Sequence, residues 1–390
     1  MSNTYTGVII ADIHAGAFNG AILQKELKKG FLKHIKNMSK LDFVVIAGDL
    51  FDTKISLNSD HTKYIFGFLK DLMSICVDKN AKLRILKGTE SHDNQQLDVL
   101  NQFIQSDCDV RIINTVEKEN LFEDFKVLYI PEEYMKDIDE YYREYFNDTY
   151  DMIFGHGMVN EVVFGAKSQQ SEVTMSRAPI FKTEKLIDIC KGPIFFGHIH
   201  KHQVIKDDLY YVGSYSRWCF GEEEPKGFMQ VEYNTGDNIY DVKFIENEYA
   251  RLFTTIVVDY NSSFYRGDPN HQIEYIMSLA KGTLADKIRI IFNIPEDYEQ
   301  PTLLVNLINE IFAKQSDIKV VINNNAKDIR TKKALEEKVT QLLDTYDFLF
   351  AKGVPTDEKL VKYAKIKHSK DIDIETMRDI LYQKLSVNIE

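Results

Sequence analysis

Five short apolar runs in this chain each end in a turn that carries aspartate or histidine. The runs are VIIADIH (Val8 to His14), FVVIAGDLFD (Phe43 to Asp52), LRILKGTESHD (Leu83 to Asp93), MIFGHG (Met152 to Gly157) and IFFGHIH (Ile194 to His200). A buried strand followed by a polar turn is how an α/β sheet delivers side chains to the crevice beyond its carboxyl ends. The five runs therefore predict one shared site built from strand ends.

Stretches with helical periodicity separate several of these runs. Residues 20–38 and 60–77 both carry apolar side chains along one stripe of a helix. Strand and helix thus alternate through the first half of the chain, which predicts an α/β fold with layers of helices and sheet. The polar residues 165–181 interrupt this rhythm and are expected to form a loop beside the site.

The pattern starts afresh near residue 251. Strand-like and helical segments alternate from there to about residue 322, which predicts a small second domain over 249–325 after a main domain of residues 1–248. The polar stretch NNNAKD at 323–328 predicts a linker. The remaining residues, 326–390, predict a tail of amphipathic helices that either packs on the body or presents an apolar face to a partner.

Composition excludes several classes of protein. The formal net charge of −12 argues against a general polyanion binder, although bound metals and a local basic rim would still allow a nucleic-acid enzyme. The four cysteines form no CxxC pair, which argues against a disulfide framework and against a thiolate metal site. We expect a cytoplasmic protein with no membrane association, because no leader or long apolar run is evident.

Carboxylates and imidazoles gather at the predicted strand ends without thiolates, a mixture that favours Mn²⁺ over a structural zinc. Five of the ten histidines lie in these turns, which favours a metal site over separate structural histidines. Asp12 and His14, two residues apart, can reach one ion, and the Asp49 carboxylate can bridge two. The candidate ligands from these turns are Asp12, His14, Asp49, His156, His198 and His200.

A pair of divalent ions about 3.5 to 4 Å apart suits in-line displacement at phosphorus, because the ions activate a hydroxide and hold the phosphate oxygens. The leaving alkoxide still needs a proton. His92 is the candidate general acid, and its alternative role is that of a further ligand.

The order of motifs DxH, GDxxD, a GN-H-like element, GH and GHxH resembles the calcineurin-like metallophosphoesterases. The segment YVGSYSRWCFGEEEPKGF resembles the one that follows GHxH in the SbcD-type DNA repair nucleases, whose relatives process double-strand breaks. This resemblance spans residues 7 to about 235. The second domain resembles that family's capping domain in position and pattern, and the tail matches its ATPase-docking helices by position.

The resemblance implies a four-layer α/β/β/α fold with a small α+β capping domain and a helical tail. It also implies two Mn²⁺ ions, with Mg²⁺ as the alternative, and it assigns the ligands as follows: Asp12, His14 and His200 on one ion, Asp49 between the two, and His156 and His198 on the other. His92 falls on the family's catalytic histidine.

Two positions depart from the family pattern. Ser91 stands where the family has an asparagine, so a serine hydroxyl would be a weaker neutral ligand of the second metal, with water or Glu90 completing the site. Asp52 stands where many relatives have a histidine, and it either orients a ligand or caps a turn.

These features predict a Mn²⁺-dependent DNA nuclease subunit for double-strand-break repair or recombination. The resemblance implies 3′-to-5′ exonuclease and endonuclease action on DNA ends, an SbcC-type coiled-coil ATPase partner, a homodimer and, for a phage-encoded chain, the host cytoplasm. One alternative is a phosphodiesterase or phosphatase on nucleotides or phosphoproteins. A third hypothesis is a weakly catalytic scaffold for the ATPase.

Several residues near the motifs have less specific predictions. Arg177, Lys167 and Arg217 are candidate contacts to the DNA backbone. His202 is expected at the surface, and Glu222 to Glu224 are expected to form an acidic hairpin tip.

Overall fold

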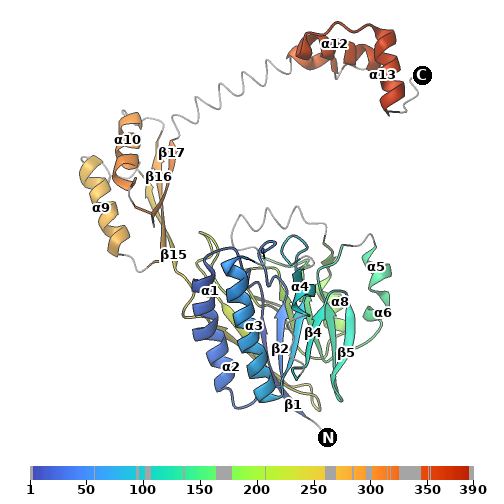
Figure 1. The fold of residues 1–390 in the computed structure, drawn as a ribbon, viewed down its shortest axis with the longest axis vertical. Helices are drawn as coiled ribbons and strands as arrows, with labels where there is room; N and C mark the ends of the chain where they lie inside the picture. The colour runs from blue at the N-terminus through green and yellow to red at the C-terminus, as the bar shows by residue number, and fades with distance from the viewer. Residues whose placement is uncertain are drawn as a thin grey trace. The chain divides into compact units, whose positions relative to one another are not determined.

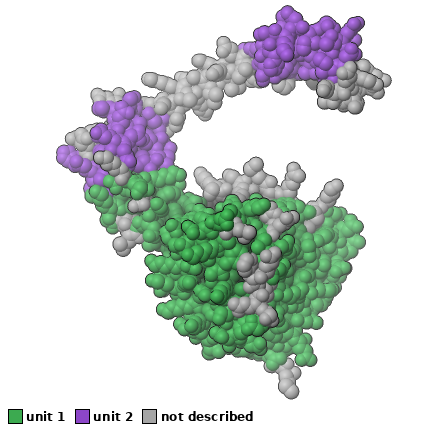
Figure 2. Space-filling model, in the orientation of Figure 1, with its two compact units in different colours: residues 1–256, 278–290, 315–319 green, residues 257–277, 291–314, 320–390 purple. Residues whose placement is uncertain are grey.

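The computed structural model comprises two compact units (Figures 1 and 2), residues 1–256, 278–290 and 315–319 in the first and residues 257–277, 291–314 and 320–390 in the second. The residues that the structure describes are 3–56, 58–93, 96–101, 107–134, 137–163, 178–206, 208–259, 269–282, 285–295, 301–313, 315–316, 318–324, 344–349, 351 and 353–385. The fold is mixed α/β with mostly parallel sheets.

The first unit contains two six-stranded sheets. The first has the order β14 (Tyr240–Glu246), β13 (Gly227–Asn234), β1 (Thr4–Ile10), β2 (Phe43–Ala47), β3 (Lys82–Leu86), β4 (Val110–Ile113). The second has the order β11 (Gln203–Ile205), β12 (Leu209–Tyr211), β10 (Ile194–Gly197), β7 (Met152–His156), β6 (Phe125–Ile130), β5 (Glu117–Phe122). Strands β1 to β4 are parallel, as are β12, β10, β7 and β6.

Helices cover both sheets, and short elements connect them. On the chain they are α1 (Gly20–Leu27), the π-helical segment η1 (Lys28–Leu32), α2 (Lys33–Asn37), α3 (Asp60–Lys79), α4 (Gln96–Leu100), α5 (Ile138–Tyr141), α6 (Arg143–Phe146) and α8 (Thr183–Asp188). Strands β8 (Met158–Val159) and β9 (Ile180–Phe181) form a small pair, so the end of the predicted polar loop is a strand. Residues 164–177, with Lys167 and Arg177, lie outside the described part.

Alternating side chains of β2 explain why the two sheets stack. Val44 and Ile46 pack into the core that includes Phe31 of η1 and Phe68 of α3, whereas Val45 lies in the core shared with the second sheet. This alternation is the two-residue period of a strand that is buried on both faces. A third core covers the outer face of the second sheet and includes Tyr142 and Leu186. Of the five predicted strand ends, three follow strands of the first sheet (β1, β2 and β3) and two follow strands of the second (β7 and β10).

A tyrosine hydroxyl interrupts the helix predicted over residues 20–38. Tyr215 donates a hydrogen bond to the Glu26 carbonyl (2.9 Å) and accepts one from the Phe31 amide (3.2 Å), and these are the groups that a continuous α-helix would use internally. A Cβ added to Gly30 would lie 2.5 Å from this hydroxyl oxygen. The inserted hydroxyl accounts for the π-helical turn of η1, and it fixes the segment after β12 to the helix.

The apolar and aromatic residues of YYVGSYSRW predict a single strand over 210–218, and the structure does not contain that strand. Strand β12 ends at Tyr211, and Ser214 makes only an isolated bridge with Ala11. The hydroxyl of Tyr215 then bonds to the backbone of Glu26 and Phe31 in the α1–η1 helix.

The predicted order of strands and helices after residue 251 is present. It consists of β15 (Phe253–Asp259), α9 (Pro269–Gly282), β16 (Lys287–Ile294), α10 (Pro301–Phe312) and β17 (Ile318–Asn324), with the three strands in one sheet. Asn323 and Asn324 belong to β17 rather than to a linker. The predicted helix around Leu335 to Leu343 lies outside the described residues.

The tail includes η3 (Asp347–Leu349) and a helical hairpin of α12 (Thr356–His368) and α13 (Ile374–Leu385). Ala364 of α12 packs with Met377 and Leu381 of α13, and Arg378 pairs with the buried Asp357 at 2.5 Å. Part of the predicted apolar stripe is therefore covered within the tail itself. In the described part of the chain, no helix has both the length and the apolar character to cross a membrane.

Candidate metal centre

Strand ends of both sheets bring the predicted ligands together. Three groups of side chains have potential ligand atoms within 4.8 Å of one another: Asp12, His14 and His200; His14, Asp49 and His92; and Asp49, His156 and His198. The three groups share members, because His14 belongs to two and Asp49 belongs to two. The geometry is therefore that of one continuous centre with two halves.

Four of these residues have a backbone that ordinary side chains seldom adopt. Asp12, His14, Asp49 and His198 have positive φ angles of 49°, 47°, 49° and 89°. Aspartate and histidine are among the residues that tolerate this left-handed region, whereas β-branched residues do not. Backbone bonds hold the turns in place: the Asp12 amide donates to the carbonyl of Gly48 (3.1 Å), and the His14 amide donates to that of Asp49 (3.0 Å).

Glycines next to the ligands make room for their close approach. A Cβ on Gly48 would lie 2.1 Å from Nδ1 of His156, and a Cβ on Gly88 would lie 2.2 Å from Oδ1 of Asp49. Gly48 also has a φ of 84°, which favours glycine. Close packing at the centre thus requires glycine at both positions, Gly48 of the GD turn and Gly88 of the GT turn.

The first half contains Asp12, His14 and His200. Nε2 of His14 lies 3.0 Å from Nε2 of His200, and the Nδ1 of His200 faces the Glu222 carboxylate at 2.7 Å. Because a carboxylate accepts, Nδ1 carries the proton and Nε2 of His200 faces the centre with its lone pair. Glu222 is therefore a buried orienting residue and not the tip of an acidic hairpin.

Glu222 is held on two sides. It accepts a hydrogen bond from the Trp218 amide at 2.7 Å, and the ammonium of buried Lys226 lies 3.7 Å away. Burial raises the pKa of Glu222, but the hydrogen bond and charge of His200, together with Lys226, outweigh burial and bring the pKa to about 2. Glu222 therefore stays charged beside His200.

The second half is arranged around Asp49. Nδ1 of His156 donates to the Ala47 carbonyl (2.8 Å), which leaves Nε2 facing Oδ2 of Asp49 at 3.2 Å. Both carboxylate oxygens of Asp12 accept from the His198 amide, at 3.0 and 3.1 Å. His198 thereby links the two halves, with its backbone bound to the first and its imidazole in the second.

Electrostatics of the buried carboxylates favour a cation. Burial raises the pKa of Asp12, and the neighbouring imidazoles oppose it only in part. Burial also raises the pKa of Asp49, but the charge and hydrogen bond of His156 and the charge of His14 outweigh it and hold that pKa well below its usual range. Burial lowers the pKa of His156, while Asp49 raises it to about 10. The centre therefore attracts positive charge.

His92 lies at the edge of the centre. Its Nδ1 bonds to the backbone carbonyl of Asp52, and its ring lies edge-on to His14 with centroids 4.8 Å apart. Oδ1 of Asp52 lies 3.4 Å from Nδ1 of His14. Buried Asp93 joins the two neighbouring turns, because it accepts from the amides of Phe51 (3.0 Å) and Gly88 (2.7 Å).

Thr89, and not Ser91, is the hydroxyl residue of this turn that reaches the centre. Ser91 and Glu90 are exposed, and Glu90 pairs with Lys87 at 3.3 Å. Thr89 is buried, and its hydroxyl donates to Oδ2 of Asp49 at 3.2 Å. The TES sequence offers two hydroxyls, and only the backbone path of the turn selects between them.

Glu132 is a second residue that sequence reasoning missed. It follows β6, and its buried carboxylate lies 3.3 Å from Nδ1 of His198. The signal was present, because VLYI at the end of β6 is an apolar run followed by PEE. Glu132 follows Pro131 instead of following the apolar run directly, so the pattern used for the five runs did not select it.

Two further predictions, for Arg217 and His202, differ from the structure. Both Nη atoms of Arg217 donate to backbone carbonyls, those of Arg251 and Glu224, and the side chain is buried, so it is not placed to hold a DNA backbone. His202 was expected at the surface, but it is half-buried, stacks on Phe244 at 4.3 Å and bonds to the Tyr211 carbonyl.

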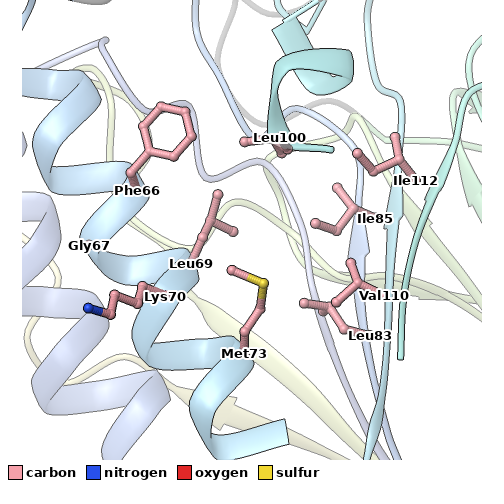
Figure 3. A pocket seen from close by; sticks show the side chains of 10 residues that line it. All are labelled: Phe66, Gly67, Leu69, Lys70, Met73, Leu83, Ile85, Leu100, Val110 and Ile112. Atoms are coloured by element: carbon pink, nitrogen blue, oxygen red, sulfur yellow. The ribbon is translucent and has the colours of Figure 1, made fainter. Parts of the chain in front are cut away.

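A separate cavity of about 410 Å³ lies between α3 and strands β3 and β4 (Figure 3). Its lining is apolar, and the ammonium of Lys70 points away from it. The lining residues are Phe66, Gly67, Leu69, Lys70, Met73, Leu83, Ile85, Leu100, Val110 and Ile112. Apart from Lys70, the lining side chains are hydrocarbon or thioether groups, unlike the carboxylates and imidazoles at the strand ends.

Comparisons with known proteins add little to this geometry. No family model matches the chain. Several solved structures match, and one of them has a TM-score of 0.36 and 10% identity, covering 63% of this chain and 100% of its own.

Proposed function

We propose that the chain is a divalent-metal-dependent phosphodiesterase of the calcineurin-like type, with the four-layer fold of that superfamily. The observation that carries the proposal is the Asp49 carboxylate, which is shared between two groups of ligand atoms. A bridging carboxylate between two sets of imidazoles is how two-ion hydrolytic centres are built. The donor set of carboxylates and imidazoles fits Mn²⁺, with Mg²⁺ as the alternative.

The bound ions would neutralise phosphate charge and activate water for attack on phosphorus. The chain's own side chains fix where this happens. Glu222 orients His200, the Ala47 carbonyl orients His156, and the left-handed turns hold Asp12 and Asp49 in position. These contacts would orient the proposed ligands toward the ions.

His92 supplies the proton for the leaving oxygen in this proposal. Its Nδ1 faces a carbonyl, which can only accept, so Nδ1 keeps its proton and Nε2 is the atom that exchanges one. Asp52 supplies that carbonyl, and its side chain lies beside His14. The backbone of Asp52 therefore sets the ring orientation of the acid.

DNA is the substrate we propose, and the chain would be the nuclease subunit of a repair or recombination complex in the cytoplasm. The support is the resemblance of the residues around Tyr215 to Phe228 to the SbcD-type nucleases, and these residues include both Trp218 and Glu222 beside the centre. In the same proposal the three-stranded domain caps DNA ends, the helical tail binds a coiled-coil ATPase, and the chain forms a homodimer.

The experiment is digestion of end-labelled linear duplex DNA with Mn²⁺, with Mg²⁺ and with EDTA. We expect Mn²⁺-dependent shortening from the 3′ end, lost in His92→Ala and retained in His34→Ala, a histidine of α2 that bonds to Gln230. Because general acid catalysis contributes about 10²- to 10⁴-fold, the loss should be of that order.

Bound manganese is measured for the same variants. His92→Ala should retain wild-type Mn²⁺ content if His92 is the acid, and loss of an ion would show it to be a ligand. Cleavage of a small phosphodiester without cleavage of DNA would favour the nucleotide phosphodiesterase. Absence of bound metal would overturn the enzymatic proposal in favour of a scaffold subunit.

A further inference from the structure

The second half of the centre contains two oxygen donors in addition to the ligands that were predicted from the motifs. Oγ1 of Thr89 lies 3.2 Å from Oδ2 of Asp49, 3.5 Å from Oε2 of Glu132, 3.5 Å from Nε2 of His156 and 3.4 Å from Nδ1 of His198. Oε2 of Glu132 is also 3.3 Å from Nδ1 of His198. Five side chains therefore direct one polar atom each toward a common region.

The convergence of these five atoms suits a shared cation. A hydroxyl has one proton to donate, whereas the carboxylates of Asp49 and Glu132 can only accept when ionised. Nδ1 of His156 donates to the Ala47 carbonyl, so Nε2 is the ring atom that would offer a lone pair to a cation once its proton is displaced. Protons of the imidazoles and of the hydroxyl can link these atoms in pairs, whereas one shared cation is a partner that all five atoms could bind at once.

The position of Glu132 is fixed independently of the other ligands. Its side chain is fully buried, its other oxygen accepts from the Tyr134 hydroxyl at 2.9 Å, and its amide donates to the Lys87 carbonyl at 3.3 Å. Among the described residues, no lysine or arginine lies within ion-pair distance of it. A buried carboxylate without such a cation is rare unless a metal or another cation neutralises it.

We propose that Glu132 is a carboxylate ligand of the second divalent cation and that the Thr89 hydroxyl is the neutral oxygen ligand of the same ion. This inference rests on the proposed two-ion centre. The second ion would then be bound by Asp49, Glu132, Thr89 and two imidazoles. The carboxylates of Asp49 and Glu132 would together neutralise the two charges of the second ion. That ion would therefore stay bound before any substrate phosphate arrives.

The test is Mn²⁺ binding to the full chain, followed by metal content and by electron paramagnetic resonance. The wild type should bind two Mn²⁺ whose spins are coupled. Glu132→Gln, which keeps the shape and removes the charge, should weaken the second ion by at least 10-fold and give the six-line signal of an isolated Mn²⁺. The matched control is Glu133→Gln, whose carboxylate accepts from the Val116 amide (2.8 Å) and the Tyr141 hydroxyl (2.7 Å) away from the centre.

Two coupled ions of wild-type affinity in Glu132→Gln would overturn this inference and leave the proposed function standing. A wild-type chain that binds no divalent ion would overturn both. Thr89 provides a second pair of variants should Glu132→Gln not fold. Thr89→Val, which removes the hydroxyl at constant shape, should weaken the second ion, and Thr89→Ser should keep it. Equal affinity in these two variants would remove Thr89 from the ligand set.

Discussion

The two halves of the candidate metal centre are built differently. In the first half, Asp12, His14 and His200 come from two motif turns, and a carboxylate outside the centre, Glu222, orients one of them. In the second half, Thr89 comes from the GTESHD turn at a position that was not predicted to be a ligand, and Glu132 lies outside the five runs. Their oxygens lie among the atoms of the predicted ligands. In the first half an outer carboxylate orients a candidate ligand, whereas in the second half additional oxygen atoms lie among the candidate ligands themselves.

The largest expected effect comes from the residue that both halves share. Asp49→Asn should reduce DNA cleavage by on the order of a thousandfold, because the amide has one oxygen in place of a bridging carboxylate. Asparagine tolerates the left-handed backbone at this position, so the fold should persist. Cleavage rates and Mn²⁺ content check this.

Asp42→Asn is the matched control, since Asp42 precedes the opposite end of the same strand and accepts from the Thr6 amide at 2.7 Å. If Asp49→Asn lost only one ion and kept most activity, the two halves would be independent rather than joined through Asp49.

The next effect concerns Glu26, a buried carboxyl on the helix that Tyr215 anchors. Burial raises the pKa of Glu26 to about 7, while Ser216 and Arg251 act in the opposite direction. A carboxyl whose pKa is raised in the folded state contributes stability that is present below its ordinary value of 4.5 and lost as pH rises through about 7. Glu26→Gln should therefore be more stable than the wild type by about 3 kcal/mol at pH 8.

Urea unfolding at pH 4.5 and pH 8 measures this difference, with exposed Glu232→Gln as the control. The Glu26→Gln advantage should shrink at the lower pH. An equal advantage at both pH values would show that a cause other than titration is responsible.

The smallest expected effect separates orientation from ligation. Glu222→Gln should weaken Mn²⁺ in the first half by about 10- to 100-fold, because His200 loses the charge that raises its basicity. The second ion should bind as before. Mn²⁺ titration followed by paramagnetic resonance distinguishes the two ions, and exposed Glu223→Gln is the control. Equal weakening of both ions would contradict the division into halves.

Much of the fold and part of the site could be predicted from the sequence. Buried runs that end in Asp or His predicted strand ends that converge, and the structure brings Asp12, His14, Asp49, His156, His198 and His200 together because parallel strands of both sheets end at this centre. The alternation of strand and helix also predicted the α/β fold.

The remaining parts depend on tertiary contacts that have no local pattern. The TES sequence offers the hydroxyls of Thr89 and Ser91. The turn in which the amides of His92 and Asp93 donate to the Thr89 carbonyl determines which of them faces the centre. Which of three consecutive glutamates meets His200 depends on how the segment after Tyr215 is anchored to a distant helix. Neither contact leaves a periodic signal in the sequence.

The left-handed backbone at four ligand positions bears on protein engineering. Such conformations cost on the order of 1 kcal/mol each, and the rest of the fold must offset that cost whether or not an ion is present. Glycine at position 12 or 49 would relieve the strain and abolish ligation together. Selecting variants of this chain for thermal resistance alone would therefore tend to remove the proposed ligands, so a screen for stabilised forms needs a test of metal binding at every round.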